Sequence, residues 1–303
     1  MSPAPIILFA YCRPDHVRGA VESLQKNSEA KDSVLYVFSD GIRSARERSG
    51  VDAVRAFLKS VNGFARVEIC ERAENWGLAK SIIVGVSEVL KKHERAIIVE
   101  DDLVVSPHFL AFMNEGLETY AADERVASLC GYFYPVKGAL PETFFLREAD
   151  CWGWATWRRG WDLFKSDGVA LLKQIEERKL EWAFDAQGSY PYTQMLRDQI
   201  AGRNHSWAIR WQASLFLAEK LTLYPRRSLV QNTGFDGTGE HCGLTKVFEV
   251  EHLQGPVKVG RIPIEENKAA ETLMAEYFRR ISAPPRPTIR SLAGRVFRKL
   301  VGT

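Results

Sequence analysis

Three consecutive acidic residues follow a run of apolar residues in the segment RAIIVEDDLVVSPHFL, residues 95–110. The apolar run predicts a buried strand that ends at Glu100, Asp101 and Asp102. Adjacent carboxylates repel one another, and a bound Mg²⁺ or Mn²⁺, which prefers oxygen ligands, would offset that cost. Side chains alternate along an extended segment, so Glu100 and Asp102 should point one way and Asp101 the other. The alternative is a solvated acidic turn before a helix that Ser106 caps.

Two further charged residues stand at the ends of predicted strands. Arg13 follows the apolar segment PIILFAY, and Asp40 follows SVLYVFS. Ligands of parallel sheets bind at the carboxyl ends of the strands, so we expect both residues near the acidic triplet. The guanidinium of an arginine suits a phosphate because it is always charged and binds through two donors. Lys80 begins a predicted helix after Gly77 and is either a ligand contact or a solvated side chain.

The segment CWGWATWRRGW places four tryptophans within residues 151–161. Trp154, Trp157 and Trp161 fall at helical spacing, which predicts a helix with most of these rings in the core. Trp152 and Gly153 precede that helix. Because sugars present apolar C–H faces that pack on aromatic rings, we expect Trp152, Gly153 and Trp154 to line a sugar or acceptor site.

A glycine-rich stretch, GFDGTGEHCG at residues 234–243, has the composition of a closing loop. It carries Asp236 and His241. His241 would contact a diphosphate or a metal once the loop closes, and the alternative is an ordinary surface loop. Asp150, directly before the tryptophan segment, and Asp236 are the two candidates for a general base, of which Asp150 is preferred.

The first 130 residues alternate strand and helix patterns, which predicts a mainly parallel α/β sheet with helices on both faces. Residues from about 140 to 260 are richer in aromatic residues and loops, as in a second lobe that shapes a pocket. We therefore divide the chain into one domain over residues 1–285 and a basic amphipathic tail over residues 286–303. The two halves of the domain, 1–135 and 136–285, would be a nucleotide-sugar half and an acceptor half by the family resemblance given below.

Composition and charge narrow the possible partners. The net charge of +3 is too small to indicate a broad basic surface for nucleic acid. The tail holds five basic residues and no acidic one, and it would either dock on the body or lie on an anionic membrane surface. The five cysteines form no CxxC pair, which favours a reduced cytoplasmic location, peripheral to the inner membrane face if the tail binds there. No apolar run approaches the length of a membrane span.

The pieces VEDDLVVSPHFL, LFAYCRPDHVRGAVESL, VFSDG, NWGLAKSIIVGVSEVL, DCWGWATWRRGW and SLVQNTGFDGTGEHCG occur in the order found in one enzyme family. Over roughly residues 5–255 the chain resembles GT-A glycosyltransferases of the N-acetylglucosaminyltransferase I type and their bacterial relatives. The resemblance implies a Rossmann-like GT-A fold, a divalent metal and a nucleotide-sugar donor. The family's histidine after the helix lysine is Val84 here. The family's general base lies in a Trp-Asp-Asp-Trp stretch. The counterpart here is SWAIRWQAS, which has no acidic residue, so the general base must come from another segment.

By this resemblance Asp102 is the metal ligand, and Glu100 and Asp101 contact the donor sugar, the ribose or metal-bound water. Asp40 would hydrogen-bond the nucleobase of the donor, and Arg13 would bind the nucleotide. The predicted function is metal-dependent transfer of a sugar, from a UDP-sugar or similar donor, to a glycan or lipid-linked acceptor in bacterial surface polysaccharide synthesis, with inversion as in the family. Two alternatives stay open: a sugar nucleotidyltransferase and a non-catalytic glycan-binding module.

Overall fold

The structure is a computed structural model that describes residues 2–237, 244–250 and 255–282. Its strands are β1 (Ile6–Ala10), β2 (Val34–Ser39), β3 (Arg66–Glu71), β4 (Arg95–Glu100), β5 (Leu103–Val105), β6 (Val126–Cys130), β7 (Thr143–Leu146), β8 (Trp154–Trp157), β9 (Leu221–Pro225) and β10 (Val230–Asn232). Its α-helices are α1 (Pro14–Gln25), α2 (Arg48–Leu58), α3 (Gly77–Leu90), α4 (Phe109–Thr119), α5 (Arg158–Trp161), α6 (Gly168–Glu177), α7 (Glu181–Phe184), α8 (Tyr192–Ile200), α9 (Ala208–Leu217) and α10 (Lys268–Ser282), and three 3₁₀ turns are η1 (Ala30–Asp32), η2 (Ala45–Glu47) and η3 (Gly234–Asp236).

Eight strands form one sheet in the order β3-β2-β1-β4-β8-β6-β9-β7. The first four are mutually parallel, as the alternation of strands and helices predicted. Strand β8 enters antiparallel between β4 and β6, and β7 is antiparallel to β9 at the edge. The prediction of an α/β fold with a mainly parallel sheet flanked by helices is confirmed, and the residues after 140 complete this same sheet.

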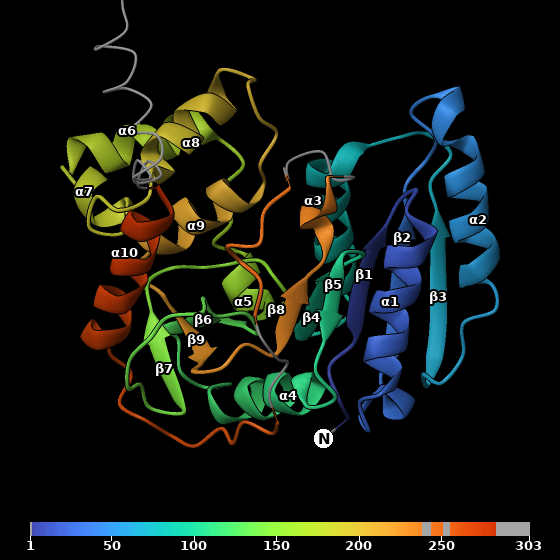
Figure 1. Ribbon diagram of the computed structural model, residues 1–303, viewed down its shortest axis with the longest axis horizontal. Coiled ribbons are helices and arrows are strands. Elements are labelled where there is room, and N and C mark those ends of the chain that lie inside the picture. Colours follow the sequence, from blue (N-terminus) through green and yellow to red (C-terminus); the bar gives the residue numbers. More distant parts are fainter. Residues whose placement is uncertain (1, 238–243, 251–254, 283–303) are drawn as a thin grey trace, which may run out of the picture.

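Helices cover both faces of the sheet because the central strands are apolar on both sides (Figure 1). Ile6 and Leu8 of β1 pack in a core with residues of α1, α2, α4 and α10. Ile7 and Phe9 point to the other face and pack with residues of α3, α5 and α9. Helix α2 was not predicted from the sequence, although Val51, Val54 and Leu58 mark its buried side at helical spacing.

Two local predictions were wrong. Trp154 and Trp157 lie on strand β8, and only Arg158–Trp161 is helical, because hydrogen bonds to β4 and β6 decide the conformation of this segment. Ser106 does not cap α4, which begins at Phe109 after the N-cap residue His108. The buried Ser106 hydroxyl instead accepts a hydrogen bond from the backbone N–H of His108 at 3.2 Å.

Candidate active site

The acidic triplet lies at the carboxyl end of β4, beside the carboxyl end of β1. Parallel pairing of the two strands sets Phe9 beside Glu100, so the chain that leaves β1 carries Arg13 to the triplet. Arg13 donates from one terminal nitrogen, Nη2, to both Asp101 Oδ1 and Asp102 Oδ2, the latter at 2.9 Å. The predicted neighbourhood of Arg13 and the triplet is therefore present.

The predicted alternation within the triplet was wrong. Strand β4 ends at Glu100, and Asp101 and Asp102 form a turn before β5, so the two-residue period of a strand no longer applies to them. Asp101 and Asp102 consequently converge on the same guanidinium instead of pointing to opposite sides. The second terminal nitrogen of Arg13, Nη1, is buried and has no hydrogen-bond partner among the described residues.

The cluster carries more negative charge than Arg13 offsets. Burial raises the pKa of Glu100 well above its usual range, and the charges of Asp102 and Asp101 raise it further. Burial also raises the pKa of Asp101 to about 6, against the lowering effect of Arg13. Three carboxylates beside one guanidinium are an environment in which a cation lowers the electrostatic free energy.

A divalent metal fits this donor set. Asp102 is the carboxylate through which it would bind, because its side chain is 16% exposed whereas that of Asp101 is 9% exposed. Within the described residues, no three His, Cys, Asp or Glu side chains are arranged to hold a metal by themselves. A metal here would complete its oxygen shell with substrate phosphates and water, as Mg²⁺ commonly does.

Strand β10 brings a second segment against the triplet. The antiparallel pairing of β10 with β5 sets Asn232 opposite Leu103, and Thr233 then donates from its backbone N–H and its hydroxyl to the carbonyl of Asp102, at 2.8 and 2.9 Å. A β-carbon at Gly234 would collide with the Asp102 carboxylate. The sequence predicted a closing loop here and gave no sign that Thr233 and Gly234 lie beside Asp102, the predicted metal ligand.

Asp40 holds the start of α3. Its Oδ1 accepts from the backbone N–H groups of Gly41 and Trp76, and its Oδ2 accepts from that of Gly77, each at 2.9 Å. Gly77 has a φ of +71°, a conformation that favours glycine. One oxygen thus makes a single hydrogen bond and keeps a lone pair with which Asp40 could meet the base of a nucleotide.

Lys80 is exposed on α3, and its ammonium makes a cation–π contact with Trp76, 4.3 Å from the centre of the ring. The guanidinium of Arg72 lies over the same ring at 3.9 Å, and its Nε is buried without a hydrogen-bond partner among the described residues. Trp76 and Arg72 were not singled out from the sequence. The ring belongs to the segment that Asp40 anchors at the start of α3.

The tryptophan segment divides between site and core. Trp152 is partly exposed and packs on Phe235 and Phe248, each with ring centres 5.5 Å apart. Trp154 is fully buried among Trp161, Trp207 and Trp211, so the prediction that it contacts a sugar was wrong: hydrogen bonding in β8 turns its ring into the core. Gly153 is buried, and its φ of +66° and close packing on Val230 explain the glycine.

The two candidate bases lie in different surroundings. Asp236, in η3, faces solvent and pairs with Nε2 of His16 at 3.3 Å. Asp150 accepts from the hydroxyl of Tyr134 at 2.7 Å and from the backbone N–H of Cys151 at 2.7 Å. Burial raises the pKa of Asp150, while these hydrogen bonds lower it. His241 and the tail over residues 286–303 lie outside the described residues.

Cys151 connects the Asp150 region to the triplet. Burial raises the pKa of its thiol well above the usual range, and the charges of Glu100, Asp150 and Asp102 raise it further. The thiol therefore lies within electrostatic reach of both carboxylate groups. Arg13 is in direct contact with Asp101 and Asp102, and Asp150 is in contact with Cys151, whereas no contact of Lys80 with the triplet is seen among the described residues.

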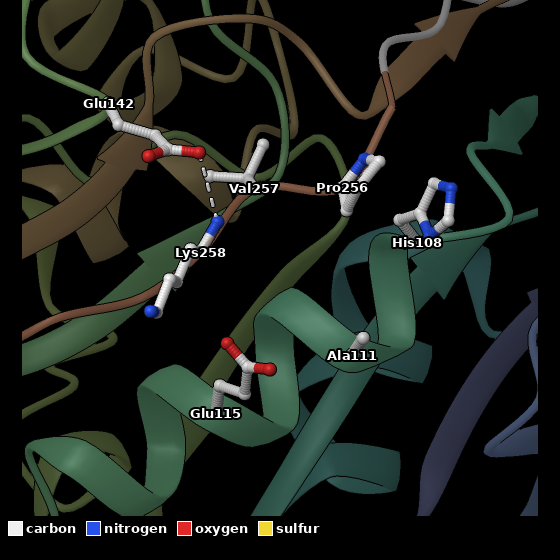
Figure 2. A pocket seen from close by; sticks show the side chains of 7 residues that line it. All are labelled: His108, Ala111, Glu115, Glu142, Pro256, Val257 and Lys258. Carbon is white, nitrogen blue, oxygen red and sulfur yellow. Dashed lines mark hydrogen bonds between the residues drawn. The ribbon is translucent and has the colours of Figure 1, made fainter.

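A separate pocket of about 210 Å³ lies between α4 and the segment around Val257 (Figure 2). Glu142 accepts there from the backbone N–H of Lys258 at 3.1 Å, and Glu115 accepts from that of Val259 at 3.2 Å. These carboxylates serve to fasten the segment along α4, and no residue of the triplet lines the pocket. In the part of the chain that the structure describes, no helix is both long and apolar enough to span a membrane.

Comparisons with known proteins give a limited result. No protein-family model matches the chain, and no curated protein matches it. Among solved structures it is similar to the mannosyltransferase PcManGT from Pyrobaculum calidifontis in complex with GDP-Man and Mn²⁺, with 12% identity, 72% of this chain and 71% of that chain covered, and a TM-score of 0.39. It is also similar to S. aureus TarS, with 15% identity, 48% and 25% covered, and a TM-score of 0.34. Likeness at these TM-scores supports no argument about activity.

Proposed function

We propose that this protein is a metal-dependent glycosyltransferase that moves a sugar from a nucleotide-diphosphate donor, a UDP-sugar, to a glycan or lipid-linked acceptor. The main observation behind this proposal is the excess of carboxylates over cations at the end of β4. Arg13 bridges Asp101 and Asp102 there, and the pKa of Glu100 is strongly raised. The motifs that resemble N-acetylglucosaminyltransferase I-type enzymes supply the donor class and the bacterial polysaccharide context.

The donor diphosphate would bind beside Asp102 and Arg13. The buried Nη1 of Arg13 has no partner among the described residues and is a donor suited to a phosphate oxygen. Mn²⁺ or Mg²⁺ bound at Asp102 would neutralise negative charge on the diphosphate as a Lewis acid. Glu100 and Asp101 would orient the sugar and ribose, and Asp40 would accept a hydrogen bond from the base through its less occupied oxygen. Lys80 and His241 would add donor contacts.

The acceptor would bind on the Trp152 side of the site. Its hydroxyl would transfer a proton to Asp150 while its oxygen attacks the anomeric carbon, and the bond from that carbon to the diphosphate would break with its electron pair leaving on the nucleotide. This single displacement inverts the anomeric configuration. Asp236 is the second candidate for the base. The basic tail, Arg286 to Lys299, would hold the enzyme at the inner membrane face, where lipid-linked acceptors are found.

Nucleotide release tests the proposal. Purified protein is given a panel of nucleotide sugars with Mn²⁺, with and without EDTA, and release of nucleoside diphosphate is measured. We expect EDTA to abolish release and Asp102→Ala to lower it by about 100-fold or more. Asp52→Ala, an exposed aspartate on α2, is the matched control and should keep wild-type activity. Full activity of Asp102→Ala would overturn the assignment.

The alternatives give different results in the same assays. A sugar nucleotidyltransferase would release pyrophosphate from a nucleoside triphosphate and a sugar phosphate, not a nucleoside diphosphate from a nucleotide sugar. A glycan-binding module would bind oligosaccharide in calorimetry without metal-dependent binding of UDP.

A further inference from the structure

Tyr134 and Asp150 form a hydrogen-bonded pair in the loops on either side of β7. The hydroxyl of Tyr134 donates to Oδ2 of Asp150 at 2.7 Å, and the backbone N–H of Cys151 donates to Oδ1 at 2.7 Å. The backbone N–H of Asp150 in turn donates to the hydroxyl of Tyr224 at 3.0 Å. Three donors therefore stabilise the carboxylate, namely the hydroxyl of Tyr134 and the backbone N–H groups of Cys151 and Trp152. A carboxylate offers about four lone-pair sites, so capacity for a further proton remains.

The ring of Tyr134 has little freedom to move. It packs against Tyr132, Phe133, Tyr277 and Phe278, with ring centres 4.8–6.0 Å apart. Phe278 belongs to α10, so the far C-terminal helix of the described chain helps to hold this ring beside a carboxylate that the β7–β8 loop presents. The hydroxyl is therefore fixed in position before any substrate arrives, which is the condition for orienting a base.

We propose that Tyr134 is a positioning residue, which fixes the Asp150 carboxylate so that one oxygen can take the proton of the acceptor hydroxyl. This role rests on the proposed glycosyltransferase function. In this step the acceptor O–H bond breaks and its proton passes to Asp150, while the acceptor oxygen forms a bond to the anomeric carbon. The bond from that carbon to the diphosphate oxygen breaks, and the nucleoside diphosphate leaves with the electron pair. Tyr134 keeps its own proton throughout and donates a hydrogen bond to the carboxylate.

Among the described residues, no cationic side chain lowers the pKa of Asp150. Seven neutral titratable side chains interact with it, namely Cys130, Tyr132, Tyr134, Cys151, Tyr190, Tyr192 and Tyr224. Burial raises the pKa of each of these groups, so they stay protonated near neutral pH. The hydrogen bond from Tyr134 is thus a main influence that lowers the pKa of Asp150 against the effect of burial.

The pH dependence of turnover tests this role. Removing the hydroxyl in Tyr134→Phe weakens the stabilisation of the ionised carboxylate, so the pKa of Asp150 rises. The acidic limb of the pH profile of kcat should then move to higher pH by roughly one unit, which is the shift equivalent to the loss of one such hydrogen bond. Tyr132→Phe is the matched control, since the hydroxyl of Tyr132 donates to the carbonyl of Phe248 at 3.0 Å and not to Asp150. Its acidic limb should stay where it is in the wild type.

A second substitution keeps the fold intact if Tyr134→Phe is unstable. Incorporation of 3,5-difluorotyrosine in place of Tyr134 retains the ring and makes the phenol a stronger donor, so the limb should move to lower pH. An unmoved limb in these variants, or an equal movement in Tyr132→Phe, would overturn the role of Tyr134. Absence of any nucleotide-sugar turnover by the wild type would instead overturn the proposed function, and this role with it.

Discussion

Gly234 packs against the carboxylate of Asp102, so closely that no side chain larger than hydrogen fits between them. The pairing of β5 with β10 creates this contact, because it continues into the hydrogen bonds from Thr233 to the Asp102 carbonyl. The predicted metal ligand is thus held from both sides: Arg13 binds its carboxylate, and the chain after β10 fixes its backbone.

The first prediction concerns this contact. Gly234→Ala should displace the Asp102 carboxylate and lower metal-dependent turnover on the order of 100-fold, since displacements of about 1 Å can have such effects. Turnover would be measured against Mn²⁺ concentration. Gly260→Ala is the control, because a β-carbon at that position meets no atom within 4 Å. Equal activity of both variants would show that the contact is irrelevant to metal use.

The second prediction concerns the anchoring of α3. Asp40→Asn replaces a carboxylate that accepts from three backbone N–H groups by an amide with a single accepting oxygen. We expect the free energy of unfolding to fall by about 1–3 kcal/mol and the KM for the donor to rise. Urea denaturation and donor titration measure the two effects. Asp52→Asn, on the exposed side of α2, should change neither. If Asp40→Asn keeps the wild-type KM for the donor, Asp40 anchors α3 but takes no part in donor binding.

The third prediction concerns the buried Glu148. Burial, followed by the charge of Glu266, raises its pKa from an ordinary value of 4.5 to about 8, and its Oε2 has no partner among the described residues. Since the folded state holds the proton more tightly than the unfolded chain, this group's contribution to stability is complete below pH 4.5 and is lost as the pH rises toward about 8.

Glu148→Gln removes this titration while keeping the size of the side chain. The free energy of unfolding should therefore depend less on pH between 4.5 and 8, and the variant should be more stable than the wild type above pH 8, by an amount on the order of a few kcal/mol. Thermal or urea unfolding across pH measures this. The exposed Glu22→Gln should follow the wild-type curve. A curve for Glu148→Gln that parallels the wild type would contradict the prediction.

The fourth prediction separates the two tryptophans. Trp154→Ala should lower the free energy of unfolding by about 3–5 kcal/mol, because the ring is fully buried in the core. Trp152→Ala should cost less stability, because the ring is partly exposed, and should instead raise the KM for the acceptor, because we propose that the acceptor binds beside this ring. Kinetics at saturating donor, together with unfolding curves, distinguish the two. An unchanged acceptor KM in Trp152→Ala would remove it from the site.

Several features of the site could be predicted from short segments. The apolar runs predicted β1, β2 and β4. Glu100 ends β4, Asp40 directly follows β2, and Arg13 lies shortly after β1, so all three are at the carboxyl ends of these strands. This inference is secure because the carboxyl ends of parallel strands all lie on the same side of the sheet. It required no knowledge of how distant segments pack.

Other features could not be found in this way. The helical spacing of Trp154 and Trp157 was misleading because β8 gains its hydrogen bonds from β4 and β6, far away in the chain. Tyr134 gave no signal, since an aromatic residue in a loop is ordinary until packing with Phe278 brings its hydroxyl to Asp150. Asp101 was expected to turn away from Asp102, and the end of β4 at Glu100 changed that.

The sequence by itself therefore determined the alternating strands and helices, because hydrophobic periodicity is a local property. It also placed the charged residues together, because the carboxyl ends of parallel strands lie on the same side of a sheet. Only the tertiary structure decided which carboxylate meets which partner: Asp102 with Arg13 and Gly234, and Asp150 with Tyr134. These pairs join segments far apart in the chain, and their geometry is set by packing and strand pairing rather than by the residues beside them.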